Sequence, residues 1–338
     1  MIKKIFKFSN TESTQYCFNA AFDNLSQLIA VENAILITDK LVYTAHKNKL
    51  KQWSTIVLPF SGEQIKTQQT VNYLIRELIK KKVDKSACLI GMGGGTITDL
   101  VGYVAAIYMR SISVGFVPTT LLAMVDAAVG GKNGVNYNRF KNIIGTTYQP
   151  DFVLYDYDFL NTLPRQEWIS GFAEMIKHAC IKNATMLQLL SKHTISFFQK
   201  NKEELARLIQ NNVLLKLKIV QQDEQDKASR HLLNFGHTIG HALERVYKIS
   251  HGQAIAIGMA IDCTISEKHI GFKQTREIVQ LLKQYELPTS YPYNKKALVN
   301  TLQMDKKKEG KNIQYVLLEK IGKGCIEKIP IAYLIKWL

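Results

Sequence analysis

Apolar segments that alternate with helical patterns in the first third of the chain constrain the fold more than any other feature of this sequence. Four of them have the composition of buried strands, at residues 34–38, 54–58, 87–90 and 112–117. Apolar side chains at helical spacing lie between them, at residues 63–82 and 99–109. Strands that alternate with helices form a parallel sheet, and ligands bind at the carboxyl ends of its strands. The sequence therefore predicts an α/β domain with a site at one edge of its sheet.

The second half of the chain has helical patterning almost throughout, from residue 164 to about residue 270. The predicted helices are residues 166–182, 203–221, 231–246 and 254–268, and a short strand follows at residues 314–318. A chain of 338 residues is long enough for two domains, at roughly 100–200 residues per domain. We expect an α/β domain over residues 1–158 and a mainly α-helical domain over residues 159–338.

The chain is strongly basic, with 44 Lys and Arg residues against 28 Asp and Glu residues and a net charge of +16. Such an excess is typical of a nucleic-acid-binding protein, a membrane-surface protein, an enzyme with an anionic substrate, or a lysine-rich surface. Proteins that bind nucleic acid interleave exposed basic clusters with aromatic side chains, and this sequence has no such pattern. We therefore expect no nucleic-acid partner and interpret most of the lysines as solvated.

The five cysteines are scattered along the chain and form no CxxC pair. This spacing argues against a disulfide scaffold or a cysteine zinc site, and it indicates a reducing compartment. The first eight residues also lack the apolar core of a signal peptide. Together these features predict a cytoplasmic protein.

Between residues 100 and 131, only Arg110 and Asp126 carry a formal charge. We reject a membrane span because Arg110 would lie near its centre, where a charge costs about 2.5–3.5 kcal/mol. We expect a buried helix, strand and helix instead, and no membrane partner. Buried charges are kept when they are paired or used in a site. Arg110 and Asp126 are therefore either site residues or a structural ion pair.

Glycine and threonine residues follow two of the predicted strands. Residues 91–95 form a glycine-rich turn before a helix, which either presents backbone N–H groups to an anion or is a turn without a ligand. Thr119 and Thr120 could hold a ribose or a phosphate, or could cap a helix at residues 121–128. Lys132 and Lys141 could pair with phosphates or be solvated.

One predicted helix carries a stripe of polar side chains on an apolar background. Arg230, Asn234, His237 and His241 recur at helical spacing and would lie on one face, with Arg230 just before the helix predicted at residues 231–246 and the other three within it. A single buried histidine is usually a core residue, but four polar residues on one face suggest a site. Neutral histidine is the commonest metal ligand.

Two further helices carry possible partners for this stripe. Glu174 shares a helix face with Lys177 and His178, either as part of a site or as a surface ion pair. His251 begins another apolar helix. Glu174, one of the two histidines of the stripe and His251 would form a two-histidine, one-carboxylate zinc set with an open position, which is the form of a catalytic zinc site.

Short motifs in these regions occur in an order that resembles the 3-dehydroquinate synthase family. They are residues 93–95, 118–120, 125–126, 130–132, 141–142, 174–177, 233–241, 251–252 and 305–307. The resemblance spans about residues 35–320. The ordered set is highly specific, although few of its parts are specific alone.

The resemblance implies a Rossmann-like N-terminal domain, a mainly α-helical C-terminal domain, a homodimer, and NAD with zinc or cobalt as cofactors. The implied enzyme is a carbon–oxygen lyase of the shikimate pathway, which leads to chorismate and the aromatic amino acids. It converts 3-deoxy-arabino-heptulosonate 7-phosphate to 3-dehydroquinate and phosphate by transient NAD reduction, phosphate elimination, return of the hydride and aldol cyclisation. The alternatives are another sugar-phosphate cyclase and a metal-dependent polyol dehydrogenase of related fold.

The resemblance also implies roles for individual residues. The implied metal ligands are Glu174, His237 and His251. The implied nucleotide-binding residues are Asp39, Ser61, Gly62, Glu63, Gln64, Ile65, Lys66, Gly93, Gly94, Gly95, Thr96, Ile97, Thr98, Asp99, Thr119, Thr120, Lys132, Lys141, Phe159, Leu160, Asn161 and Thr162. The implied catalytic and substrate-binding residues are Arg110, Asp126, Lys132, Asn142, Lys177, Lys216, Arg230, Asn234, His241 and one of Lys306 and Lys307.

The sequence departs from the family pattern at a few positions. Thr98 and Ser111 stand where glycine is usual, and Gln253 stands where glutamate is usual. We expect Thr98 to affect the close approach of the nucleotide and Gln253 to loosen the orientation of the metal ligands. None of the implied metal or substrate positions is changed.

Overall fold

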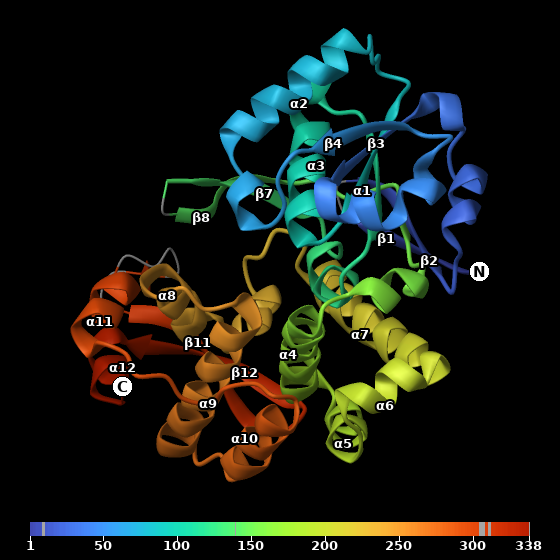
Figure 1. The fold of residues 1–338 in the computed structure, drawn as a ribbon. Helices are drawn as coiled ribbons and strands as arrows, with labels where there is room; N and C mark the ends of the chain where they lie inside the picture. Colours follow the sequence, from blue (N-terminus) through green and yellow to red (C-terminus); the bar gives the residue numbers. More distant parts are fainter. Residues whose placement is uncertain (9–10, 139, 304–307, 310–311, 338) are drawn as a thin grey trace. The chain divides into compact units, whose positions relative to one another are not determined.

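The computed structural model describes residues 1–8, 11–138, 140–303, 308–309 and 312–337 and divides the chain into two compact units (Figure 1). The first unit is Met1–Pro164 with Lys216–Gln225, and the second is Arg165–Leu215 with Asp226–Leu338. The expected fold class is confirmed, because the first unit contains a mixed α/β sheet and the second is mainly helical. The domain boundary after residue 158 stays a prediction.

A seven-stranded sheet with the strand order β1-β2-β9-β6-β5-β3-β4 organises the first unit. Its strands are β1 (Ile2–Phe8), β2 (Thr11–Phe18), β3 (Ala34–Asp39), β4 (Ser54–Leu58), β5 (Cys88–Gly93), β6 (Ser113–Pro118) and β9 (Phe152–Leu154). β1 and β2 are antiparallel, and all other neighbours are parallel. The strands predicted from the sequence are β3 to β6, so the predicted parallel sheet is confirmed.

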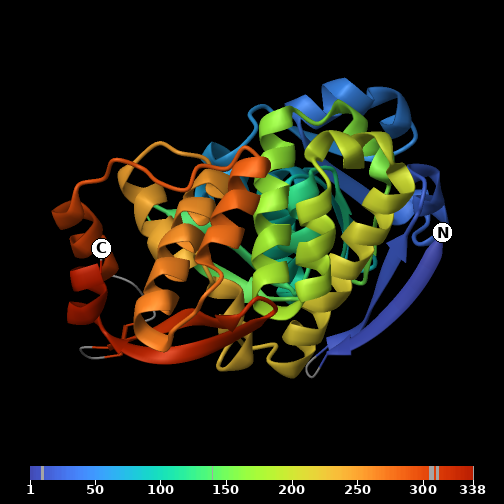
Figure 2. The ribbon, with the colours of Figure 1, turned by 90° about the horizontal axis from the view of Figure 1, so that it is seen from below.

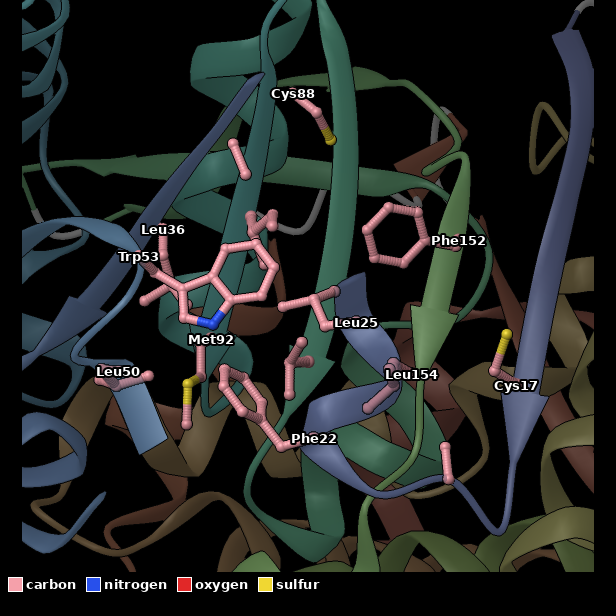
Figure 3. Packing of buried hydrophobic residues seen from close by; sticks show 14 of the residues in the cluster. Cys17, Phe22, Leu25, Leu36, Leu50, Trp53, Cys88, Met92, Phe152 and Leu154 are labelled. Carbon is pink, nitrogen blue, oxygen red and sulfur yellow. The ribbon is translucent and has the colours of Figure 1, made fainter. Parts of the chain in front are cut away.

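Helices connect the parallel strands of this sheet. They are α1 (Lys40–His46), α2 (Gln68–Lys80) and α3 (Gly95–Ile107). Every residue of β3 and β5 is buried, which is typical of strands that are covered on both faces. Phe22, Trp53, Leu36 and Met92 belong to one buried cluster beside these strands (Figure 3). Burial of one such side chain stabilises the fold by about 1.5–3 kcal/mol.

A two-stranded hairpin, β7 (Lys132–Tyr137) and β8 (Phe140–Thr147), follows β6 and was not predicted. The end of the hairpin away from its turn is held by Asn133, whose side-chain amide donates to the carbonyls of Gly131 and Tyr148, both at 2.8 Å. Polar residues alternate poorly with apolar ones here, so the sequence has no clear strand period. The hairpin carries three of the residues that the resemblance implies, namely Lys132, Lys141 and Asn142.

The second unit combines helices with a small antiparallel sheet (Figure 2). The helices are α4 (Arg165–Lys182), α5 (Ala184–Lys192), α6 (Ile195–Lys200), α7 (Lys202–Gln222, whose last residues belong to the first unit), α8 (His237–Val246), α9 (His251–Ile270), α10 (Thr275–Gln284), α11 (Lys295–Gln303) and α12 (Ile331–Trp337). The sheet has the strands β10 (Lys308–Glu309), β11 (Asn312–Lys320) and β12 (Lys323–Pro330). None of the described helices is long and apolar enough to cross a membrane.

The prediction of one continuous helix over residues 231–246 is wrong. Residues Ser229–Asn234 form a 3₁₀ helix, and α8 begins only at His237. Gly236 lies between them with φ +77° and ψ −18°, a left-handed conformation that ends one helix and starts the next. The predicted polar stripe is therefore divided between two short helices, with Arg230 and Asn234 on the first and both histidines on the second.

The prediction that Arg110 is buried is also wrong. α3 is followed by a 3₁₀ turn, Tyr108–Arg110, and the Arg110 side chain is exposed. The chain reverses there into β6, so the residue lies at the surface of the turn. A 13-residue helix is about 20 Å long, and α3 therefore separates Arg110 from the glycine turn at its other end. A substrate contact by Arg110 stays a prediction.

The same turn contains three consecutive residues with positive φ: Met109 at 50°, Arg110 at 61° and Ser111 at 89°. With ψ 136°, Ser111 has a conformation that side-chain-bearing residues rarely adopt and that glycine adopts without strain. Such strain costs about 1–3 kcal/mol per residue. Ser111 is the position where the family pattern has glycine.

We predict that Ser111→Gly raises the free energy of unfolding by about 1 kcal/mol, because it removes this strain. Urea denaturation measures the change. Ser54→Gly at the start of β4 is the control, since its φ is not positive and glycine there lowers stability. A Ser111→Gly protein that is less stable than the wild type would contradict the strained turn.

Candidate functional site

Glu174 is the centre of a buried polar cluster in the second unit. It lies on α4 and is fully buried. Its Oε2 atom forms an ion pair with Lys177 one turn further along α4. Its Oε1 atom lies 3.4 Å from Nε2 of His237 and 3.0 Å from Nε2 of His251. The structure thus brings together the carboxylate and the two histidines that the sequence suggested as metal ligands.

Glycines allow the two histidine-bearing helices to pack closely. A Cβ atom on Gly258 of α9 would lie 1.9 Å from the carbonyl oxygen of Gly236, and one on Gly240 of α8 would lie 3.0 Å from that of Ala254. Side chains at these positions would force the backbones apart. The close contact leaves the imidazole rings of His237 and His251 with their centroids 5.6 Å apart.

The environment of His237 suits a neutral metal ligand. Nδ1 of His237 lies 3.1 Å from the carbonyl oxygen of Phe235, so it donates a hydrogen bond there and leaves the Nε2 lone pair facing Glu174. Burial, together with the positive charge of Lys177, lowers the pKa of His237 to about 3. The ring is therefore deprotonated at neutral pH, as metal binding requires.

His251 lies between two carboxylates. Its Nε2 atom faces Glu174, and its Nδ1 atom lies 3.6 Å from Oε1 of Glu244 on α8. Burial lowers the pKa of His251, but the two carboxylates outweigh burial and raise it to about 10. The same negative charges that keep a proton on His251 would attract a metal cation to this place.

The geometry of the three residues fits a zinc-type ion. One atom from each of Glu174, His237 and His251 lies within 4.8 Å of the others. Ligand atoms held at about 2.1 Å in a tetrahedron lie about 3.4 Å apart, close to the 3.0 and 3.4 Å separations from Glu174 Oε1. Two imidazoles and one carboxylate with an open position are the donor set of catalytic zinc sites.

The Gln253 side chain takes part in the cap of α9, and its expected effect on the orientation of the metal ligands stays a prediction. Its Oε1 atom accepts a hydrogen bond from the Ser250 backbone N–H at 3.0 Å, and the Ser250 hydroxyl accepts one from the Gln253 N–H at 3.4 Å. This reciprocal pair is a capping box for α9, in which glutamine and glutamate serve equally. The carboxylate that orients His251 is Glu244, which the sequence did not single out.

In the first unit, the glycine turn joins β5 to the N-terminus of α3. Gly94 is the residue that precedes α3. A Cβ atom on Gly93 would lie 2.7 Å from Ile97, and one on Gly95 would lie 2.9 Å from Cβ of Ala127. The turn is therefore too tight for other residues, and its helix N-terminus is suited to a phosphate. Thr98 is buried and its hydroxyl donates to the Gly95 carbonyl at 3.1 Å.

The segment at residues 61–66 contacts this turn through polar side chains. Lys66 is buried and forms an ion pair of 2.5 Å with Asp99 of α3. Burial lowers the pKa of Lys66, but Asp99 and Glu63 outweigh it, so the pKa lies above its usual value. Glu63 accepts a hydrogen bond from the Asn136 side chain at 2.7 Å. Asn136 of β7 was not predicted, and it ties the hairpin to this segment.

The two threonines after β6 have different environments. Thr120 accepts a hydrogen bond from the Ala123 N–H at 3.1 Å, so the helix-cap alternative is confirmed for it. The Thr119 hydroxyl is buried and has no hydrogen-bond partner among the described residues. A buried hydroxyl without a partner costs free energy that a ligand would recover. Asp39 caps α1 through the N–H groups of Leu41 and Val42.

Residues 159–162 lie in a 3₁₀ helix, Tyr157–Thr162, of the first unit. The side chains of Phe159 and Leu160 are buried, so these two residues offer a ligand only their backbone. Asn161 and Thr162 are exposed. The Thr162 hydroxyl lies 3.2 Å from Nε2 of His46, whose ring meets Phe159 edge to face.

The implied substrate-binding residues are distributed over both units. In the first unit, Lys216 donates to Oδ1 of Asp126 at 2.6 Å. Lys132 and Asn142 of the hairpin are exposed. In the second unit, Arg230 is buried, whereas Asn234 and His241 are half-buried. Lys306 and Lys307 lie outside the described residues.

Comparison with known proteins gives matches along most of the chain. Residues 55–170 match the family model for the 3-dehydroquinate synthase N-terminal region, and residues 171–308 match that for the C-terminal region. The chain is 40% identical to the 3-dehydroquinate synthase of Pyrococcus abyssi over 290 residues, 84% of each chain. It is 39% identical to that of Bacillus pumilus over 318 residues, which are 90% of this chain and 86% of the relative.

Two solved structures share the fold of almost the whole chain. A 2-deoxy-scyllo-inosose synthase, complexed with carbaglucose-6-phosphate, NAD+ and Co2+, has a TM-score of 0.86 at 22% identity and covers 99% of both chains. The 2-epi-5-epi-valiolone synthase of Streptomyces hygroscopicus, with NAD+ and Zn2+ bound, has a TM-score of 0.84 at 22% identity over 99% of this chain and 97% of its own. At these identities the likeness is one of fold.

We predict that Glu244→Gln weakens zinc binding about 10–100-fold, because the neutral amide no longer holds the His251 ring and its charge. Titration of the apo-protein with zinc against a chelating dye measures this affinity. Gln253→Glu is the matched control near the same ligand, and its zinc affinity should stay close to that of the wild type. Unchanged affinity in Glu244→Gln would contradict the orienting role of Glu244.

Proposed function

This chain belongs to the 3-dehydroquinate synthase family and has the activity of that family, and we propose that it acts with bound NAD and a divalent metal ion, zinc or cobalt. The proposed substrate is 3-deoxy-arabino-heptulosonate 7-phosphate, and the products are 3-dehydroquinate and phosphate. The observation that carries the metal part of this proposal is the set of Glu174, His237 and His251 around one point.

The proposed chemistry requires a hydride carrier and an electrophile. When bound, NAD takes up and returns a hydride, and the metal ion polarises the substrate oxygen. Glu174, His237 and His251 would hold the metal ion. Lys177 neutralises the other oxygen of Glu174, which keeps one oxygen of this buried carboxylate available to the ion.

The first unit would bind the nucleotide through the glycine turn. The backbone N–H groups at the start of α3 would bind the pyrophosphate, because a helix N-terminus after a glycine-rich turn favours such an anion. Lys66 brings a buried positive charge to Asp99, near the N-terminal end of α3. The unpartnered hydroxyl of Thr119 suits a ribose hydroxyl. These features support NAD as the carrier.

The remaining polar residues would bind and orient the substrate. Lys132, Arg230 and one of Lys306 and Lys307 would hold its carboxylate and phosphate. Asp126, held by Lys216, and Asn142 would orient its hydroxyls. His241 is half-buried, and its ring centroid lies 5.0 Å from that of His237, so it would be positioned to move a proton.

We further propose a cytoplasmic homodimer. Support for the reducing compartment comes from the five cysteines, all of which are free. Support for the dimer is the resemblance to the family. Light scattering of the purified protein would measure its mass in solution, and a monomer at micromolar concentration would contradict the dimer.

We predict that purified protein with the heptulosonate phosphate, zinc and trace NAD releases phosphate without lasting accumulation of NADH, because each hydride that leaves the substrate returns to it. Glu174→Ala should abolish both zinc binding and phosphate release. Glu203→Ala, at a surface position of α7, should keep both. Net NADH formation would indicate the dehydrogenase alternative, a different carbocyclic product would indicate another cyclase, and full activity without metal would refute the ligand set.

We predict that Lys66→Met weakens NAD binding roughly tenfold or more, since it removes a charged hydrogen-bond donor and leaves Asp99 unpaired. Calorimetric titration with NAD measures the change. Lys80→Met is the matched control, because Lys80 pairs with Glu77 on the exposed side of α2. NAD affinity equal to that of the wild type in Lys66→Met would contradict the nucleotide site, while zinc affinity should be unaffected in both variants.

A further inference from the structure

We propose that Asp262 is a positioning residue of the metal centre, which acts by holding the backbone turn that places His237. The residue lies on α9, and only 1% of it is exposed. Its Oδ2 atom accepts a hydrogen bond of 2.7 Å from the N–H of Gly236. Its Oδ1 atom accepts one from the Tyr315 hydroxyl of β11. The proposal rests on the proposed function, because it concerns the same metal centre.

The backbone conformation of Gly236 sets the direction in which the His237 side chain points. The left-handed conformation of Gly236 separates the preceding 3₁₀ helix from α8, and the first residue of α8 is His237. Its neighbour on the other side, Phe235, provides the carbonyl that accepts from Nδ1 of His237. A rotation of this turn would therefore move both the ligand and the group that orients it.

Two contacts from α9 fix Gly236 from different sides. The carbonyl oxygen of Gly236 packs so closely against α9 that a Cβ atom on Gly258 would lie 1.9 Å from it. Asp262, one turn further along α9, binds the N–H of the same residue. The Gly236 N–H is thus bound by α9, while its carbonyl packs against the same helix and accepts from the Gly240 N–H of α8 at 3.0 Å. The helix α9 also provides His251 at its first turn.

The use of a carboxylate at this place needs a reason. Burial of a carboxylate is costly unless it is hydrogen-bonded, and a neutral group would be sufficient to link α9 to β11. Ser266, one turn beyond Asp262, makes such a neutral link, because its hydroxyl accepts from the Leu318 N–H at 3.0 Å. A charged acceptor forms the stronger hydrogen bond to a backbone N–H. Asp262 therefore holds the turn more firmly than packing alone requires.

Zinc and cobalt binding by three variants tests the proposal. In Asp262→Asn, the neutral side-chain oxygen can still accept from the Gly236 N–H and the amide can donate to the Tyr315 oxygen, so the variant removes the charge of the acceptor. Tyr315→Phe removes only the second anchor of Asp262 and keeps the Gly236 bond. Ser266→Ala is the matched control, since it breaks a buried link between α9 and β11 that does not reach Gly236.

We expect Asp262→Asn to raise the zinc dissociation constant roughly tenfold and to change the visible spectrum of the cobalt-loaded protein. Tyr315→Phe should change the zinc dissociation constant and the cobalt spectrum in the same direction, but by a smaller amount. Ser266→Ala should lower the urea midpoint of the apo-protein but leave the zinc dissociation constant and the cobalt spectrum unchanged. Wild-type zinc affinity and cobalt spectrum in both Asp262→Asn and Tyr315→Phe would refute the role of Asp262, as would an equal loss of affinity in Ser266→Ala. A wild-type protein that binds no zinc would instead refute the metal centre itself, and this inference with it.

Discussion

The fully buried carboxylate of Glu174 is the constraint on which the rest of the second unit depends. A carboxylate is expensive to bury unless charges and hydrogen bonds compensate it. Here one oxygen faces Lys177 and the other faces His237 and His251. The two histidines could not reach it unless α8 and α9 met α4 at one place. The need to compensate one buried charge therefore selects the packing of three helices, and the same packing creates a cation site.

Close packing of α8 against α9 brings the two histidines to the Glu174 carboxylate. Gly236, Gly240 and Gly258 remove side chains where α8 and α9 touch, so backbone meets backbone. Glycine within a helix costs about 0.5–1 kcal/mol relative to alanine, and a chain without a use for the close contact would gain stability by replacing it. In this protein the contact brings two imidazoles to one carboxylate. The glycines that lower the stability of the helices are thus the residues that allow the ligand set to form.

Sequence patterns predicted the elements whose cause is local. The strands β3 to β6 and the helices α4, α7 and α9 follow from apolar periodicity, and the ligand set of Glu174, His237 and His251 followed from residue types and the family resemblance. Features that depend on tertiary contact were missed. Gly236, where the helix breaks, packs against α9, a contact between segments that helical spacing does not reveal, and Arg110 is exposed because the chain reverses after α3. The sequence also gave no sign of Glu244 or Asp262, because each acts through another residue.

The large positive charge of the chain contributes little to the buried polar clusters. Among the described residues, the buried lysines are Lys66, Lys177 and Lys216, and each contacts a carboxylate: Asp99, Glu174 and Asp126 respectively. The clusters are therefore close to neutral on their own, and each lysine is held in one orientation before a ligand arrives. An anionic ligand does not have to order these side chains, so less entropy is lost on binding. The net charge of +16 must then reside mostly on exposed lysines, and its size says little about the reaction.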